Sequence, residues 1–138
     1  MIALGKPHHI GITVSSLDTS AAWYADTLGF IEIRRVNVPE RGLTILLIER
    51  DGFVIELFEK TDSTPIRPEE RDVPTSLGYG GYRHLAFTVP SVDAAWAEFE
   101  AAGRDLVVPP TDNEKLGFRL CFIRDPDGVL LEFVQPLA

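Results

Sequence analysis

The chain has 138 residues, of which 45% are hydrophobic and 25% charged, and its formal net charge is −8. These values describe a globular protein of one compact domain and exclude disorder over most of the chain. The excess of carboxylates argues against nucleic acid and against an anionic membrane surface as partners, because binding to phosphate needs clustered Lys and Arg. The sequence shows neither a secretory signal nor an apolar stretch long enough to span a bilayer, so we expect a cytoplasmic protein.

A βαβββ order is predicted for the first half of the chain. Apolar runs and helix signals indicate a strand, a helix and three more strands, at residues 7–14, 15–28, 30–38, 43–49 and 53–58. Ser16 or Asp18 is expected to cap the helix, and Gly29 is expected to end it in a left-handed conformation. Asp51-Gly52, between the last two strands, is typical of a tight hairpin turn.

The same order is predicted for the second half of the chain. A strand, a helix and three strands are expected at residues 82–89, 91–102, 105–108, 117–124 and 129–135. Ser91 or Asp93 is expected to cap the helix, and Pro109-Pro110 to end the strand 105–108. Residues 125–128 are expected to form a second hairpin. The intervening segment 60–81 holds three prolines and several charges, which predicts a linker or surface loop with little regular structure.

Two segments of the first half recur in the second half. The strand that starts at His9 (HIGITV) matches the strand that starts at His84 (HLAFTV), and the segment around Glu56 (IELF) matches the segment around Glu132 (LEFV). The histidines are 84 − 9 = 75 positions apart and the glutamates 132 − 56 = 76. This spacing indicates a duplicated module. We therefore predict an α+β fold in which a single domain, residues 1–138, is built from module 7–59 and module 82–136, joined by the linker 60–81.

The recurring His and Glu residues are candidate metal ligands. Side chains alternate between the two faces of a strand. Each of these His and Glu side chains therefore points to the face opposite to that of the aliphatic residues next to it in sequence. A carboxylate on an apolar strand is costly to bury unless it is paired or ligated. Taken singly, each His is more often a structural strand residue and each Glu an edge residue. Their recurrence at matched places favours one divalent ion, of zinc, nickel, iron, cobalt or manganese, bound by His9, Glu56, His84 and Glu132.

Four other residues have simpler interpretations. His8 and Glu59 have strand parity opposite to His9 and Glu56, so we expect an edge or surface residue in His8 and a solvated carboxylate in Glu59. Arg119 lies on a predicted strand, where it could reach a substrate anion or equally belong to a solvated face. Cys121 is the single cysteine, it lies among apolar residues, and we expect a buried and unreactive thiol.

These motifs resemble the vicinal oxygen chelate superfamily, which contains glyoxalases, bleomycin-resistance proteins and extradiol dioxygenases. HIGITV is similar to its first ligand strand, Trp23-Tyr24 with Leu28-Gly29-Phe30 to its helix ending, and the segments 125–128 and 131–133 to its closing hairpin and last ligand. The resemblance covers nearly the whole chain. It implies a glyoxalase-like fold, in which the paired modules form an open, barrel-like cup around a metal. It also implies a homodimer, with ligands drawn from one chain or from both.

Within that family the ligand set separates the activities. The set of two His and two Glu is similar to that of glyoxalase I, whereas methylmalonyl-CoA epimerase typically has Gln at the place of Glu56 and the dioxygenases use three ligands. The resemblance implies a divalent-metal-dependent lyase or isomerase that acts on a small oxygenated substrate through a metal-bound enediolate. Glu56 and Glu132 would be the catalytic carboxylates, with Glu56 as the more mobile base and Glu132 remaining bound.

Two alternatives remain within the same family. One is an iron(II) extradiol-type dioxygenase, and the other is a non-catalytic resistance protein that binds a drug or another small molecule. The chain shows no clear match to the residues with which glyoxalase I binds glutathione, so the sequence does not name the substrate.

Overall fold

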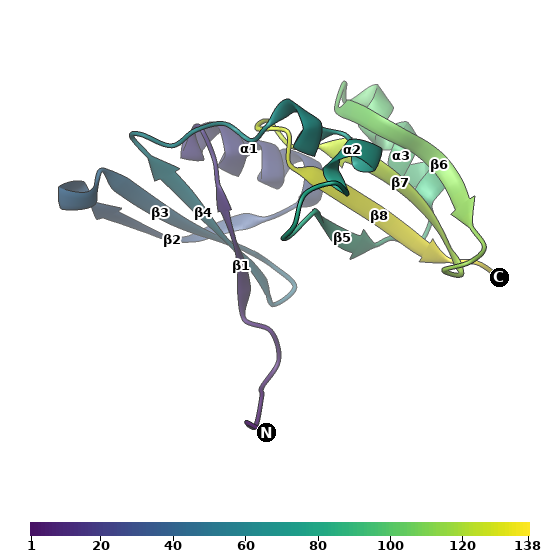
Figure 1. Cartoon of the computed structure of the whole chain (residues 1–138), viewed down its shortest axis with the longest axis horizontal. Helices are drawn as coiled ribbons and strands as arrows, with labels where there is room; N and C mark the ends of the chain where they lie inside the picture. Colours follow the sequence, from purple (N-terminus) through teal and green to yellow (C-terminus); the bar gives the residue numbers. More distant parts are fainter. The chain divides into compact units, whose positions relative to one another are not determined.

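The computed structural model describes all residues from 1 to 138, and the chain divides into two compact units, residues 1–65 and 66–138. Each unit contains one four-stranded mixed sheet and the same βαβββ order of elements (Figure 1). The predicted α+β fold of paired βαβββ modules is therefore confirmed. None of the helices combines the length and hydropathy that a bilayer-spanning helix requires.

The first unit follows the predicted order closely. Its elements are β1 (His9–Thr13), α1 (Leu17–Leu28), β2 (Ile31–Val38), a 3₁₀ turn η1 (Pro39–Arg41), β3 (Leu43–Arg50) and β4 (Phe53–Lys60). The strands lie in the order β1-β4-β3-β2, so the first and last strands of the module are neighbours and run parallel. The other neighbours pair antiparallel.

The second unit repeats this sheet. Its elements are η2 (Pro68–Arg71), α2 (Val73–Ser76), β5 (His84–Thr88), α3 (Val92–Ala101), β6 (Asp105–Asn113), β7 (Phe118–Arg124) and β8 (Leu130–Pro136). The strand order is β5-β8-β7-β6, and β5 again runs parallel to β8. The short helices η2 and α2 lie within the segment 60–81, where the sequence had indicated a linker or surface loop.

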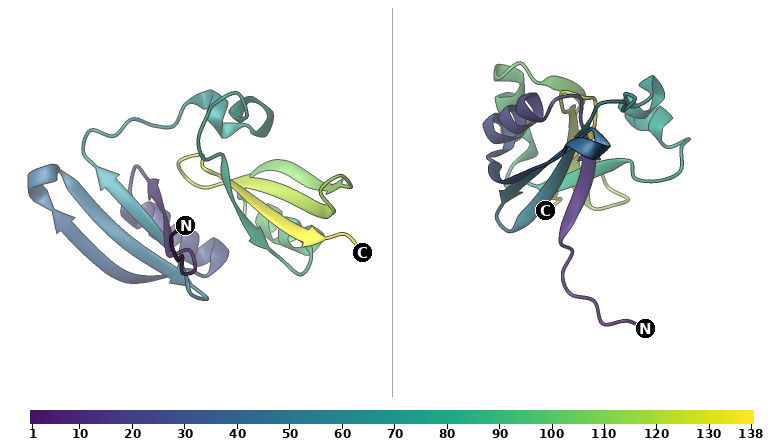
Figure 2. Two further views of the ribbon diagram at one scale, coloured as in Figure 1. Left: turned by 60° about the horizontal axis from the view of Figure 1, so that its bottom comes forward. Right: turned by 90° about the vertical axis from the view of Figure 1, so that its left-hand side faces the viewer.

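One helix covers one face of each sheet (Figure 2, left). In the first unit, Leu17, Tyr24 and Leu28 of α1 are buried together with the β3 and β4 side chains Leu46, Ile48, Ile55 and Leu57. In the second unit, Phe99 of α3 contacts Phe133 of β8 with ring centroids 4.7 Å apart. Cys121 is fully buried on this face, and burial raises the pKa of its thiol to about 11, which confirms the expectation of a buried thiol.

Both helices begin as predicted with a serine cap. The hydroxyl of Ser16 accepts a hydrogen bond from the backbone N–H of Thr19, and that of Ser91 accepts one from Ala94. Gly29 ends α1 with a left-handed φ of 71°. The Asp51-Gly52 turn, with φ values of 51° and 80°, has the two positive angles of a type I′ hairpin.

Glu59 is exposed, as the sequence indicated, and it also has a structural partner. Its Oε2 atom accepts a hydrogen bond of 2.7 Å from the backbone N–H of Leu17, one of the N–H groups that a helix leaves unpaired at its start. Gln135 has the equivalent role in the second unit, where its Oε1 atom lies 2.5 Å from the N–H of Val92. The last strand of each module thus holds the first turn of the helix through one side chain.

The strand predicted at 105–108 is longer in the structure. β6 continues through Pro109-Pro110 to Asn113. Proline lacks a backbone N–H and normally interrupts the hydrogen-bond ladder of a sheet. Here the ladder shifts register between Val108 and Thr111, so that the two prolines fall outside the paired positions. β6 is also the edge strand of its sheet, where proline is tolerated.

We predict that Glu59→Ala lowers the free energy of unfolding by about 1 kcal/mol, because it removes an acceptor from the start of α1. Glu59→Gln should lose less, since its amide oxygen still accepts the bond and only the charge near the helix dipole is lost. Urea unfolding of the two variants and the wild type measures the difference. Equal stability of wild type and Glu59→Ala would show that the bond contributes nothing.

Candidate metal centre

In the first unit, His9 and Glu56 form a close pair on adjacent parallel strands. The Nε2 atom of His9 lies 3.1 Å from Oε2 of Glu56, and the two side chains are 40% and 23% exposed. The register pairs Glu56 with Gly11, so His9 stands two residues before the partner of Glu56 on the same face. The pair therefore follows directly from the register of β1 with β4.

The second unit repeats this pair with nearly identical geometry. The Nε2 atom of His84 lies 3.0 Å from Oε2 of Glu132, and the side chains are 32% and 10% exposed. The register pairs Glu132 with Ala86, which reproduces the offset of two residues. The structure thus brings the four predicted residues together as two pairs, one in each unit.

The geometry of each pair fits two ligands of one metal ion. Ligand atoms bonded to zinc at ~2.1 Å, with an angle of roughly 90–110° between the bonds, lie ~3.0–3.4 Å apart. The measured separations of 3.1 Å and 3.0 Å agree with that range. No group of three or more His, Cys, Asp or Glu side chains is placed so that it could hold a metal ion. Each unit by itself therefore offers two ligands, which is half of a four-ligand set.

The surroundings of the two pairs differ in packing. Glu132 is a buried carboxylate whose register partner on β7 is Phe122, and the Phe122 ring meets His84 edge-on at a centroid distance of 5.1 Å. The corresponding partner of Glu56 on β3 is Leu47, and its partner on β1 is Gly11. A Cβ atom at position 11 would lie 2.9 Å from the ring of Phe58, so the position has room for little more than glycine. Glu56, with a side chain 23% exposed against 10% for Glu132, is nevertheless the less confined carboxylate.

Arg119 does not belong to this face of the sheet. Its side chain lies on the opposite face of β7 from Phe122, and it forms ion pairs with Asp93 of α3 and Asp112 of β6, at 2.8 Å and 2.7 Å. The guanidinium holds the pKa of the Asp93 carboxyl below its ordinary value, mainly through their hydrogen bonds. Of the two interpretations left open by the sequence, the structure supports a surface ion-pair network.

His8 is exposed, as the sequence indicated, but it has a contact that strand parity did not reveal. Its Nδ1 atom lies 2.7 Å from Nδ1 of His9, and the two rings meet edge to face. The available signal was the His-His dipeptide itself. Parity places neighbouring side chains on opposite faces only within a regular strand, and β1 begins at His9.

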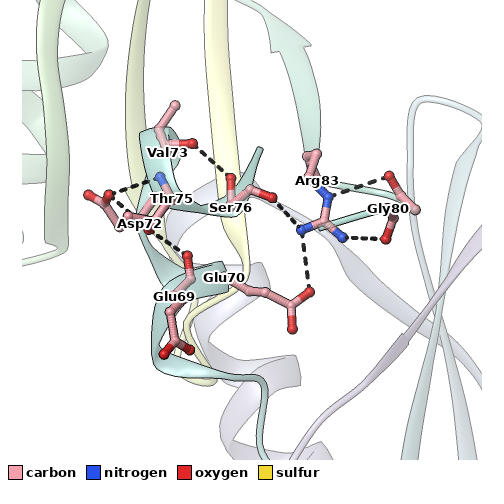
Figure 3. Close-up of polar contacts among 9 residues, drawn as sticks. Glu69, Glu70, Asp72, Val73, Thr75, Ser76, Gly80 and Arg83 are labelled. Atoms are coloured by element: carbon pink, nitrogen blue, oxygen red, sulfur yellow. Dashed lines mark hydrogen bonds and ion pairs between the residues drawn. The ribbon is translucent and has the colours of Figure 1, made fainter. Parts of the chain in front are cut away.

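Arg83, immediately before His84, anchors the preceding segment (Figure 3). Its side chain is 16% exposed and donates hydrogen bonds to the carboxylate of Glu70 and to the backbone oxygens of Ser76 and Gly80, at 3.3, 2.9 and 3.1 Å. One guanidinium thus joins η2, α2 and the start of β5 in the second unit. Sequence reasoning did not single out Arg83, because its partners are mostly backbone carbonyls, which no residue pattern shows.

Comparison with known proteins identifies the family. The model of the Glyoxalase/Bleomycin resistance protein/Dioxygenase superfamily matches residues 6–133. The chain belongs to this superfamily. It is 39% identical to the uncharacterized protein YwkD of Bacillus subtilis over 93% of this chain and 94% of that protein.

Relatives with named activities are more distant. A probable lactoylglutathione lyase of Vibrio parahaemolyticus is 27% identical, over 95% of this chain and 91% of that protein. The human mitochondrial methylmalonyl-CoA epimerase is 29% identical, over 96% and 74% respectively. Among solved structures, a glyoxalase family protein from Enterococcus faecalis superposes with a TM-score of 0.80 at 28% identity, covering 94% of this chain and 97% of that one.

We predict that Arg83→Ala makes the segment 66–82 about ten-fold more sensitive to chymotrypsin, which would cut at Leu77, Tyr79 or Tyr82. The reason is that loss of the Arg83 hydrogen bonds lowers the free energy of local opening. Mass spectrometry of the first cleavage products measures the effect. Lys115→Ala, on the exposed turn before β7, is the matched control. Unchanged cleavage of Arg83→Ala would show that Arg83 does not hold the segment.

Proposed function

We propose that this protein is a divalent-metal-dependent enzyme of the lyase or isomerase type, which moves a proton on a small oxygenated substrate. The observation that carries the proposal is the pair of equivalent His–Glu contacts, at 3.1 Å and 3.0 Å, on the same strands of two duplicated modules. Core packing would favour aliphatic residues at these positions. A shared need for metal ligands explains why both modules keep an imidazole and a carboxylate.

The proposed ligands are His9, Glu56, His84 and Glu132. A bound divalent ion would supply Lewis acidity, which stabilises negative charge on the substrate oxygens when a neighbouring carbon loses its proton. The donor set of two imidazoles and two carboxylates suits zinc, nickel, iron(II), cobalt or manganese and offers no thiolate. Relatives named as a lactoylglutathione lyase and a methylmalonyl-CoA epimerase support the lyase or isomerase class.

Within this proposal the two carboxylates have different roles. Glu132 is confined, with a side chain 10% exposed, and is suited to remain a ligand throughout. Glu56 is 23% exposed, so its carboxylate is less confined than that of Glu132. Glu56 would take the proton from the carbon next to a carbonyl and return it at the neighbouring position, leaving the carboxylate unchanged after each turnover.

The metal is tested first. We expect about one equivalent of divalent metal per chain in the wild type, measured by mass spectrometry after reconstitution, and clearly less in His84→Ala, because the variant keeps only three of the four proposed ligands. Glu100→Gln, on the exposed side of α3, is the control and should keep its metal. Stoichiometric metal that survives His84→Ala unchanged would sink the four-ligand site.

The arrangement of the site is a separate question, because the four ligands could come from one chain or from two copies in the homodimer that we expect. Mixing His9→Ala with His84→Ala decides it. If each site draws one pair from each copy, mixed dimers regain one intact site, and metal binding returns. If each site lies within one chain, every site in the mixture lacks a ligand and no recovery follows.

Catalysis is tested at Glu56. Methylglyoxal with glutathione and methylmalonyl-CoA are the two first substrates, and incorporation of solvent deuterium reports proton transfer. We expect Glu56→Gln to lower kcat by a factor of ~10²–10⁴ while most of the metal is retained, since an amide can ligate through its oxygen and cannot take a proton. A fully active, metal-loaded Glu56→Gln variant would remove Glu56 as the base.

The two other activities of the superfamily have distinct signatures. Activity that returns only with iron(II) and O₂ would assign the protein to the dioxygenases. Binding of an apolar drug that is unaffected by chelation would assign it to the binding proteins.

A further inference from the structure

The ring of His9 has a partner on each of its two nitrogens. Nε2 faces the carboxylate of Glu56 at 3.1 Å, and Nδ1 faces Nδ1 of His8 at 2.7 Å. The rings of His8 and His9 meet at 84° with centroids 5.0 Å apart. His8, His9 and Glu56 therefore form a short chain of polar contacts within the first unit, and His9 is its middle member.

Elementary imidazole chemistry limits how this chain can be protonated. In a neutral imidazole one nitrogen donates a hydrogen bond and the other accepts one. When the Glu56 carboxylate accepts a bond from Nε2–H of His9, Nδ1 of His9 must accept, and His8 donates. When Nε2 uses its lone pair for a metal, Nδ1 of His9 carries the hydrogen, and His8 must accept. An imidazole can serve in both arrangements, because either of its nitrogens can carry the hydrogen.

We propose that His8 is a positioning residue for His9, holding the ring through Nδ1 in both the metal-free and the metal-bound state. The inference rests on the proposed function for the presence of a metal. The exchange between the two states is balanced. One proton leaves Nε2 of His9 for solvent, the Nδ1 proton of His8 passes to Nδ1 of His9, and Nε2 of His8 takes one proton from solvent.

The histidine of the second unit is supported in a different way. His84 is held by packing, because its ring meets Phe122 edge-on at 5.1 Å and its Glu132 partner is buried. His9 is more exposed, at 40% against 32%, and Glu56 is also the more exposed carboxylate. A hydrogen bond from outside the ligand set is a common way to fix the orientation and tautomer of a metal-binding histidine. In the first module, the preceding residue, His8, supplies this hydrogen bond to His9.

The test compares His8→Ala, His8→Gln and His8→Phe, with Lys6→Ala in the same segment as control. Long-range ¹H–¹⁵N spectra of histidine-labelled, metal-free protein report which nitrogen of His9 carries hydrogen. We expect the Nε2–H form in the wild type, a switch to Nδ1–H after Zn²⁺ is added, and a mixture of forms in metal-free His8→Ala. Zn²⁺ titration should show 10- to 100-fold weaker binding in His8→Ala and His8→Phe.

His8→Gln should recover most of the affinity, because its amide group can both donate and accept. The role of His8 is overturned if His8→Ala keeps both the wild-type tautomer and the wild-type Zn²⁺ affinity, or if His8→Gln loses as much as His8→Phe. Failure of the wild type itself to bind Zn²⁺ would count against the proposed function. In that case the metal-free spectra still decide the His8 contact, which is refuted if His8→Ala leaves the His9 tautomer unchanged.

Discussion

The parallel pairing of the first and last strands in each module fixes the position of the His–Glu pair in both units. It aligns Gly11 with Glu56 and Ala86 with Glu132, and thereby places each histidine two residues away on the same face. A slip of one residue would turn the carboxylate towards the helix-covered face, where it would meet the apolar core. The burial of Ile55, Leu57, Leu131 and Phe133 against the helices opposes such a slip, so hydrophobic packing on one face sets the geometry of the His–Glu pairs on the other.

Much of this arrangement could be predicted from the sequence because it depends on local or repeating patterns. The apolar runs, the serine caps, the Asp51-Gly52 turn and the recurrence of His and Glu at spacings of 75 and 76 residues are all visible in one dimension. The missed features depend on contacts between distant residues. Pro109-Pro110 lie within a strand because that strand is an edge with shifted register, and Glu59 meets the start of α1 only after the sheet has formed. Arg83 binds carbonyl groups that every residue possesses.

The two modules share the same scaffold, and the structure shows where they differ. The second pair is enclosed, with a buried glutamate and an aromatic ring against the histidine. The first pair is more exposed, and a second imidazole lies beside its histidine. These differences match the needs of a site in which one carboxylate stays fixed and the other accepts a proton. A rigid ligand benefits from packing, whereas a base must change its position or its charge.

An even division of ligands between the modules has an energetic consequence under the proposed function. Neither pair offers more than two donor groups, so most of the affinity for a divalent ion would arise only when one pair from each kind of module meets. The free energy of metal binding would then stabilise that association, in the same way that structural zinc stabilises the fold of small domains. Removal of the metal should accordingly leave each four-stranded sheet intact, because the core of each sheet lies under its own helix and contains none of the proposed ligands.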